Sequence, residues 1–350
     1  MPFENQLDIN VRAFFFNAKT DYLPYYKNFS FTMQKETTLK DVLKLIKEKN
    51  SNFSYPEKDL VFRVNELIVT GEEKVAEVVQ DLGTELLIEP ALKYRSNNGL
   101  ILNDHDFIHN FRQIFKRHME SKEDLINYVK CYPLHYASET FNYNHEYIGD
   151  AILVLAHKMI TEGCSDCKDE ILKAINDPFN GIRCCEYENN IYKGEDYGEK
   201  IAELKEMINL KEKESLIDKL SAKTLRTLDH SLESIEGRNI AFYAGDKNLN
   251  SKELKKKIER EIAQSSANLI KFEMSNKLAG QTIIDSHREL AHQKAGTVLL
   301  NALDNGADTL ICSKDSDLDF FKNVISRCER VMGREIELKL ISLGEFEDLK

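Results

Sequence analysis

The chain has 350 residues, and its length, composition and charge already exclude several classes of protein. At roughly 100–200 residues per domain, this length predicts two or three domains that can each bury a core. A formal net charge of −11 leaves no global positive field to gather the phosphates of nucleic acid or anionic lipid. Hydrophobic residues make up 42% of the chain, too many for a disordered protein. We therefore expect a soluble globular protein that binds no nucleic acid.

Neither the N-terminus nor any later segment has the pattern of a targeting or membrane segment. Residues 1–16 lack the basic and apolar regions of a signal peptide, and no apolar run approaches the ~18 residues of a membrane helix. The seven cysteines, an odd number, fit a reducing compartment better than a disulfide framework. These features predict a cytoplasmic protein without direct membrane insertion.

Residues 1–104 are predicted to form a small α+β domain of the β-grasp type. Two β-rich runs at 9–16 and 29–33, joined by a polar turn, predict a hairpin. A helix is expected next, because Thr37 or Thr38 can cap it and an apolar stripe follows at helical spacing. That stripe consists of Leu39, Val42, Leu43 and Ile46. Further short strands are expected at 60–65, 66–71 and 84–90, with Val75, Val78 and Val79 packed between them.

The rest of the chain is predicted to contain an all-helical domain and an α/β domain. The helical domain covers residues 105–236, and its cysteines lie in loops. It ends in a charged stretch at 199–234, which is typical of a solvated amphipathic helix that bridges two domains. In residues 237–350, strands alternate with helices, which predicts a layered α/β domain with a mostly parallel sheet. Its strands are expected at 239–245, 268–274, 309–313 and 336–343.

Three parts of the chain resemble known iron–sulfur proteins. Residues 9–107 resemble the N-terminal ferredoxin-like domain of the iron–sulfur subunit of succinate dehydrogenase and fumarate reductase. The matching pieces are VRAFFFNAKTDYLPYYKNFSF, TTLKDVLKLIKE, LVFRVNELIVTG, and LLIEPAL followed by LILNDHDF. The helical segment is similar to that subunit's cysteine-rich helical domain, through EYIGDAILVLAHKMI and GIRCCEYENN. Residues 239–330 resemble the cysteine-rich domain of heterodisulfide reductase, through IAFYAG, LAG at 278–280 and AGTVLLNALDNGADTLICSKDSDLDFF.

The chain departs from these families at the positions of their cluster ligands. A plant-type [2Fe–2S] cluster needs four thiolates, and residues 50–90 contain no cysteine. In the last domain, Asp246 stands where the family places a cysteine. Leu278 and Ala279 replace a double cysteine, and Cys312 alone remains. The resemblance thus implies a scaffold that has lost its clusters, so no cofactor is expected.

One candidate metal centre remains near the end of the helical domain. Its candidate ligands are Cys164, Cys167, Cys184 and Cys185. The C-x2-C pair followed by two more thiols is close to the spacing of a zinc ribbon, and would hold one zinc or iron–sulfur centre. Adjacent cysteines rarely both ligate one zinc ion, so Cys131 or His157 would complete the site. The alternatives are packed or vestigial thiols, and a redox-active pair.

Two other groups of chemically active side chains favour structural roles. Asp315, Asp317 and Asp319 follow an expected strand, where acids cap a helix or complement its dipole more often than they bind magnesium. His287 and His292 are placed on one expected helix, five residues apart and therefore on different faces.

We therefore predict a cytoplasmic bacterial protein that is a non-catalytic interaction, assembly or regulatory subunit derived from an iron–sulfur electron-transfer subunit. The resemblance implies a protein partner, such as a flavoprotein or a membrane-bound reductase subunit. The first alternative is an oxidoreductase component that retains one atypical metal or dithiol centre at residues 164–185. The second is small-molecule binding at the strand ends of the C-terminal domain.

Overall fold

The computed structural model describes residues 6–115, 122–163, 167–209 and 228–350, and these form two compact units. The first unit is Met1–Phe141, Ile148–Ile175 and Asn190–Ile201, and the second is Asn142–Tyr147, Asn176–Asn189 and Ala202–Lys350. No helix in the described ranges is long and apolar enough to cross a bilayer. The division into three domains with boundaries after residues 104 and 236 stays a prediction.

The first unit contains a mixed five-stranded sheet in the order β2-β1-β5-β3-β4. Its strands are β1 (Gln6–Phe15), β2 (Tyr25–Gln34), β3 (Phe62–Val64), β4 (Leu67–Val69) and β5 (Glu85–Pro90). Strands β1 and β2 pair antiparallel, which confirms the predicted hairpin. Both strands are longer than the β-rich runs from which they were predicted. Strand β5 pairs parallel with β1 and antiparallel with β3, so the first and last strands lie side by side in the sheet.

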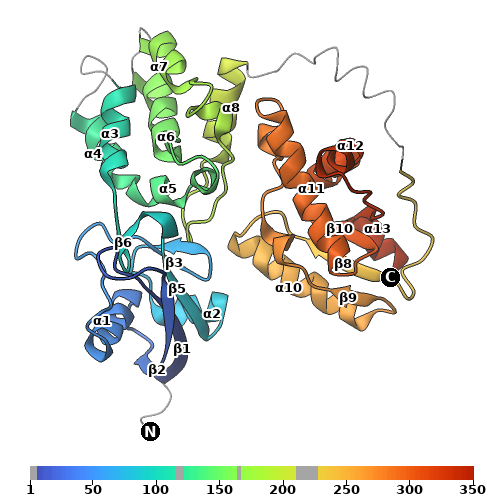
Figure 1. Cartoon of the computed structure of the whole chain (residues 1–350), viewed down its shortest axis with the longest axis horizontal. Helices are drawn as coiled ribbons and strands as arrows, with labels where there is room; N and C mark the ends of the chain where they lie inside the picture. The colour runs from blue at the N-terminus through green and yellow to red at the C-terminus, as the bar shows by residue number, and fades with distance from the viewer. Residues whose placement is uncertain (1–5, 116–121, 164–166, 210–227) are drawn as a thin grey trace. The chain divides into compact units, whose positions relative to one another are not determined.

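Two helices, α1 (Leu39–Lys49) and α2 (Val75–Leu82), accompany this sheet (Figure 1). The apolar stripe predicted for α1 is confirmed, because all four of its members are buried. The Thr38 hydroxyl accepts the Asp41 N–H while the Asp41 carboxylate accepts the Thr38 N–H, a reciprocal cap. Helix α2 was not predicted. It is eight residues long and has no side-chain cap, so the sequence shows only a short run of valines.

The remainder of the first unit is mainly helical. Its helices are α3 (His105–Ile114), α4 (Lys122–Lys130), α5 (Tyr132–Ala137), α6 (Asp150–Lys158) and α7 (Lys168–Ile175), and a short ladder pairs β6 (Ser96–Asn98) with β7 (Ile101–Leu102). Stacked rings of Phe107 and Tyr128 lie at its core with centroids 4.2 Å apart. His135 is fully buried beside them, and its Nε2 lies 2.9 Å from Oδ2 of Asp106.

The predicted charged helix is confirmed only at its start. Helix α8 (Gly198–Ile208) spans the boundary between the two units as the chain divides, and residues 210–227 lie outside the described residues. Residues 228–234 are not helical, so the prediction of a helix reaching 234 is wrong there. Its proposed bridging role stays a prediction.

The second unit contains an all-parallel four-stranded sheet in the order β11-β10-β8-β9, which confirms the predicted parallel sheet. Its strands are β8 (Asn239–Tyr243), β9 (Asn268–Ile270), β10 (Thr309–Cys312) and β11 (Lys339–Ser342). Each strand is shorter than its predicted range, because the flanking residues form loops or belong to the next helical turn. The central strands β8 and β10 are almost entirely buried, as expected for a sheet covered on both faces.

Helices cover both faces of this sheet (Figure 1). They are α10 (Leu249–Gln264), α11 (Arg288–Asp304), α12 (Asp315–Met332) and α13 (Leu343–Leu349). One face packs Tyr243 and Cys312 against α11 and α12, and the other packs Phe242 against α10 and α13. From β8 the chain proceeds to β9 on one side, whereas β10 and β11 follow on the other side. The direction of winding therefore switches between β8 and β10, and such a switch point opens a crevice at the carboxyl ends of the strands.

Candidate functional site

The switch point of the second unit is the first place to seek a ligand site, because open α/β sheets bind ligands at the carboxyl ends of their strands. Two loops meet there. One follows β8 and contains Gly245 and Asp246, and the other follows β10 and contains Ser313 and Lys314. Asp317, in the first turn of α12, lies against both loops.

Direct contacts join the two loops. Ser313 donates its backbone N–H to the Tyr243 carbonyl at 3.0 Å and its hydroxyl to the Ala244 carbonyl at 2.9 Å. The ammonium group of Lys314 lies 2.9 Å from Oδ2 of Asp246. Gly245 has φ +86°, and a Cβ there would lie 2.8 Å from a carboxylate oxygen of Asp317. The two loops are therefore bonded to each other at this edge of the sheet.

Asp317 has an unusual electrostatic environment at this edge of the sheet. Its Oδ2 is buried and has no hydrogen-bond partner among the described residues. Burial raises the pKa of Asp317 to about 6; the Lys314 ammonium opposes that rise and the Asp246 carboxylate adds to it. Burial likewise raises the pKa of the Cys312 thiol well above its ordinary value, and the Asp317 charge adds to the effect. Asp317 can thus exchange a proton near neutral pH, whereas Cys312 stays a neutral thiol.

Two ion pairs with buried carboxylates hold residues 182–188 within the second unit. The Lys247 backbone N–H donates to Oε1 of Glu188 at 2.7 Å, and the Lys247 ammonium lies 3.5 Å from Oε2. The side chains of Glu188 and Lys247 are only 1% and 3% exposed. Glu186, also buried, forms an ion pair with Lys294 of α11. Desolvation offsets much of the attraction in such pairs, but breaking an ion pair leaves a buried charge without its partner. The pairs therefore define where this segment lies.

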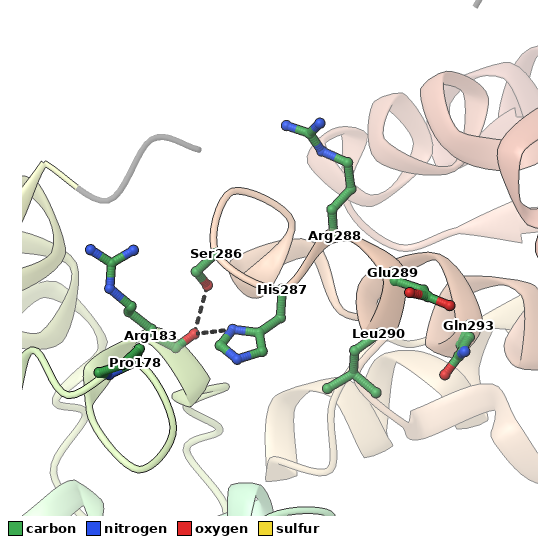
Figure 2. A pocket seen from close by; sticks show the side chains of 8 residues that line it. All are labelled: Pro178, Arg183, Ser286, His287, Arg288, Glu289, Leu290 and Gln293. Carbon is green, nitrogen blue, oxygen red and sulfur yellow. Dashed lines mark hydrogen bonds between the residues drawn. The ribbon is translucent and has the colours of Figure 1, made fainter. Parts of the chain in front are cut away.

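A cysteine and a histidine meet at the start of the same segment. The Cys184 sulfur lies 3.7 Å from Nε2 of His287, and the other ring nitrogen, Nδ1, lies 3.1 Å from the Arg183 carbonyl oxygen (Figure 2). That carbonyl can only accept, so Nδ1 carries the proton and Nε2 presents its lone pair to the sulfur. The Cys184 thiol also lies 2.9 Å from the Phe179 carbonyl. Burial raises the pKa of Cys184, which keeps it a thiol.

The four cysteines predicted as metal ligands have different positions. Cys164 lies outside the described residues, and Cys167 is a partly buried residue of the first unit. Cys184 and Cys185 are buried residues of the second unit. Within the described ranges, no three His, Cys, Asp or Glu side chains are arranged as a metal site. The four-cysteine centre stays a prediction.

Asp246 and Cys312, two of the positions at which the resemblance expects cluster ligands, lie near the carboxyl ends of β8 and β10, but their side chains do not fit an iron–sulfur cluster. Cys312 is 1% exposed and packs in the same core cluster as Ala279 and Tyr243. Asp246 is held by Lys314. Because cluster irons are held mainly by several thiolates, one buried thiol among apolar neighbours cannot supply the ligands.

Sequence reasoning placed Asp315, Asp317 and His287 only in part. Asp315 and Asp317 do lie in the first turn of α12, where acids favour the helix dipole, but Lys314 occupies the cap position and no side chain caps the helix. His287 was expected on a helix and instead precedes the first residue of α11. The ion pairs of Glu186 and Glu188 could not be predicted from the sequence, because their partners lie 108 and 59 residues away.

Comparison with known proteins adds a fold relationship. No family model and no curated protein matches the chain. Among solved structures, a hypothetical protein from Helicobacter pylori is similar, with 18% sequence identity and a TM-score of 0.50. The match covers 97% of this chain and 71% of that one. At this identity the likeness concerns the fold alone.

Proposed function

We propose that this chain is a non-catalytic interaction, assembly or regulatory protein, built on the scaffold of an iron–sulfur electron-transfer subunit without its clusters. The observation that carries the proposal is how the side chains at the switch point are bonded and packed. There, Asp246 is ion-paired and Cys312 is packed in an apolar core, so both positions serve the protein's own structure. A fold can persist without the chemistry that it hosts in other proteins.

The finer features of the scaffold belong to the same proposal. The sheet order β2-β1-β5-β3-β4, with a hairpin followed by α1, supports a β-grasp, ferredoxin-like first domain. The helices α3 to α7 support a separate helical domain, and the doubly covered parallel sheet supports a relationship to the cysteine-rich domain of heterodisulfide reductase. The protein would act in the cytoplasm on a protein partner, a flavoprotein or a membrane-bound reductase subunit.

The second candidate is an electron-transfer component that retains one metal or dithiol centre at residues 164–185. The observation that favours it is the pair of Cys184 and His287, because a thiol sulfur and an imidazole nitrogen 3.7 Å apart are both donors that zinc accepts. If a metal were bound there, these two atoms would be among its ligands.

Metal analysis separates the two candidates. The full-length protein is purified anaerobically, and iron, acid-labile sulfide and zinc are measured per chain together with a visible spectrum. We expect a colourless protein without stoichiometric metal. Stoichiometric metal that is lost in Cys184→Ser and kept in Cys328→Ser would establish the second candidate, because Cys328 is packed in the apolar core of the second unit.

The interaction itself needs its own measurement. A gently lysed native extract is separated by size, and the chain is followed by immunoblot together with flavin absorbance. We expect the chain to elute in a complex larger than the free protein, with a flavin-containing or membrane-derived protein in constant ratio. Elution of all of the chain at the size of the free protein would refute a stable partner.

A further inference from the structure

Strand β2 forms one edge of the five-stranded sheet of the first unit (Figure 1). It is ten residues long and pairs with β1 in an unbroken antiparallel register, without a proline or a bulge. Lys27 is its single charged side chain. Proteins usually shorten, bend, charge or cover such an edge, because its outward N–H and C=O groups are a template for another strand. Strand β2 is neither short nor bent, and it carries little charge.

The backbone groups of alternate β2 residues point away from the sheet. Asn10 of β1 donates its N–H to the Thr84 carbonyl at 2.9 Å, in the direction of β5. Its partner in the register with β2 is Ser30, so the N–H and C=O of Ser30 point outward, as in every pair of this kind. Because the register is unbroken, other residues have the same orientation, namely Tyr26, Asn28 and Thr32.

The outward N–H groups of these four residues have no hydrogen-bond partner within the described ranges. Of their four carbonyls, that of Ser30 accepts the Lys49 ammonium at 3.2 Å. The opposite edge of the same sheet differs, because Ile68 of β4 donates to the Asn190 carbonyl and accepts the Tyr192 N–H, both at 2.9 Å. The described chain thus covers one edge of this sheet and leaves the N–H groups of the other edge exposed.

We propose that β2 pairs with β2 of a second copy of this chain, antiparallel and about a two-fold axis at Phe29. In this register Tyr26 of each copy faces Thr32 of the other. Asn28 and Ser30 face each other in the same way, so every facing pair can exchange two backbone hydrogen bonds. A two-fold interface of this kind uses the same surface on both copies and closes after two. The pairing concerns the purified chain alone and does not depend on the proposed function.

The side chains of β2 favour a second copy as the occupant of this edge. Phe29 is half-buried and stacks on Phe31, with ring centroids 6.0 Å apart. It would meet Phe29 of the other copy at the axis, where aromatic pairs stabilise neighbouring strands. Lys27 would lie opposite Phe31, so no like charges face each other. With one charge in ten residues, β2 offers little to select a charged foreign strand, whereas it matches itself.

The contact of Lys49 with this edge does not prevent the pairing. A carbonyl oxygen has two lone pairs, so Ser30 can accept a backbone N–H beside the Lys49 ammonium. The lysine side chain is also long and flexible, and its ammonium lies over the Phe31 ring at 4.3 Å. It protects one carbonyl and none of the outward N–H groups.

The test is sedimentation equilibrium of the purified full-length chain at physiological ionic strength. Ser30→Pro removes one outward N–H and places a ring at the edge, a change that an edge strand tolerates. Ser30→Ala is the matched control, because it also loses the hydroxyl bond to Asn10 but keeps the N–H. We expect a dimer that Ser30→Pro weakens by about tenfold or more, since symmetry makes one substitution remove two hydrogen bonds. Ser30→Ala should dimerise as the unmodified chain does.

Phe29 tests the axis independently, also if Ser30→Pro does not fold. Phe29→Lys and Phe29→Glu each place like charges opposite each other, so each variant alone should be monomeric. An equimolar mixture should restore the dimer, because an ammonium then faces a carboxylate. An unmodified chain that stays monomeric up to its solubility limit, a dimer that Ser30→Pro leaves intact, or a mixture that stays monomeric would overturn the proposal. Binding of a different protein to this edge in place of the second copy would overturn it as well.

Discussion

Replacing Asp317 by Asn is expected to stabilise the protein at neutral pH and to leave its stability unchanged at low pH. The Asp317 carboxylate is held against Gly245 with one buried oxygen that accepts no hydrogen bond in the described part of the chain. Its ionised form is therefore disfavoured in the folded state. Asn has the same shape and carries no charge, so it imitates the protonated acid.

The size of the effect follows from the pKa of Asp317, which burial raises from 3.8 to about 6. One pKa unit corresponds to about 1.4 kcal/mol, so the ionised carboxylate costs up to about 3 kcal/mol, less whatever its remaining solvent contact screens. A folded-state pKa above the unfolded value means that the folded protein binds the proton more tightly. The cost is therefore fully present above pH 6 and disappears as the pH falls towards 4.

The assay is urea unfolding followed by far-ultraviolet circular dichroism, because the chain contains no tryptophan. Midpoints of Asp317→Asn and the unmodified protein are compared between pH 7.5 and pH 4.5, so that contributions common to both proteins cancel. Asp315→Asn is the control, since Asp315 is an exposed acid in the same helical turn. It should lose only about 0.3–1 kcal/mol of dipole interaction. A difference for Asp317→Asn that does not change with pH, or a destabilised variant at pH 7.5, would refute the reasoning.

Two further substitutions test how buried contacts fix the fold. Lys247→Met is expected to lower the free energy of unfolding by about 3–5 kcal/mol, because it leaves the Glu188 carboxylate buried without its cation. Arg334→Met, which breaks an exposed ion pair, should cost about 1 kcal/mol or less. Gly149→Ala is expected to cost about 2–4 kcal/mol, because φ is +96° there and the new Cβ would lie 2.2 Å from the His135 ring. Chemical denaturation measures all three.

Each of these comparisons has an outcome that contradicts it. The buried pair is unimportant if Lys247→Met costs no more than Arg334→Met, or if adding Glu188→Gln to Lys247→Met recovers none of the lost stability. Gly83→Ala is the control for Gly149→Ala, because Gly83 has φ +89° and no atom within 4 Å of a new Cβ. Equal losses in the two alanine variants would mean that backbone strain alone, without the clash against His135, explains the effect.

The parts of the fold that local patterns define were predictable from the sequence. Helix α1 has an apolar stripe and a capping threonine, and strands β8 and β10 are continuous apolar runs flanked by turn residues. These signals lie within about ten neighbouring residues, so periodicity and propensity suffice to read them. Helix α2 shows the limit, because eight residues without a cap carry too weak a pattern.

The candidate site could be predicted only in outline. That strand ends can gather functional groups follows from a parallel sheet, whereas Asp246 and Cys312, which lie near such ends, were singled out by the resemblance. The contact between Cys184 and His287 was not predictable, because the two residues are 103 positions apart in the sequence. No period or spacing indicates such a pairing. It depends on the path of residues 182–188, which follows from tertiary contacts alone.

The two ion pairs of that segment join it to α11 and to the loop after β8. A buried pair adds little net stability, since desolvation offsets its attraction, yet a displaced segment would leave both carboxylates without cations. Glu186 and Glu188 therefore allow one register against Lys294 and Lys247 and penalise the others. Arg183 lies three residues before Glu186 on this segment, so the same register sets its position beside α11.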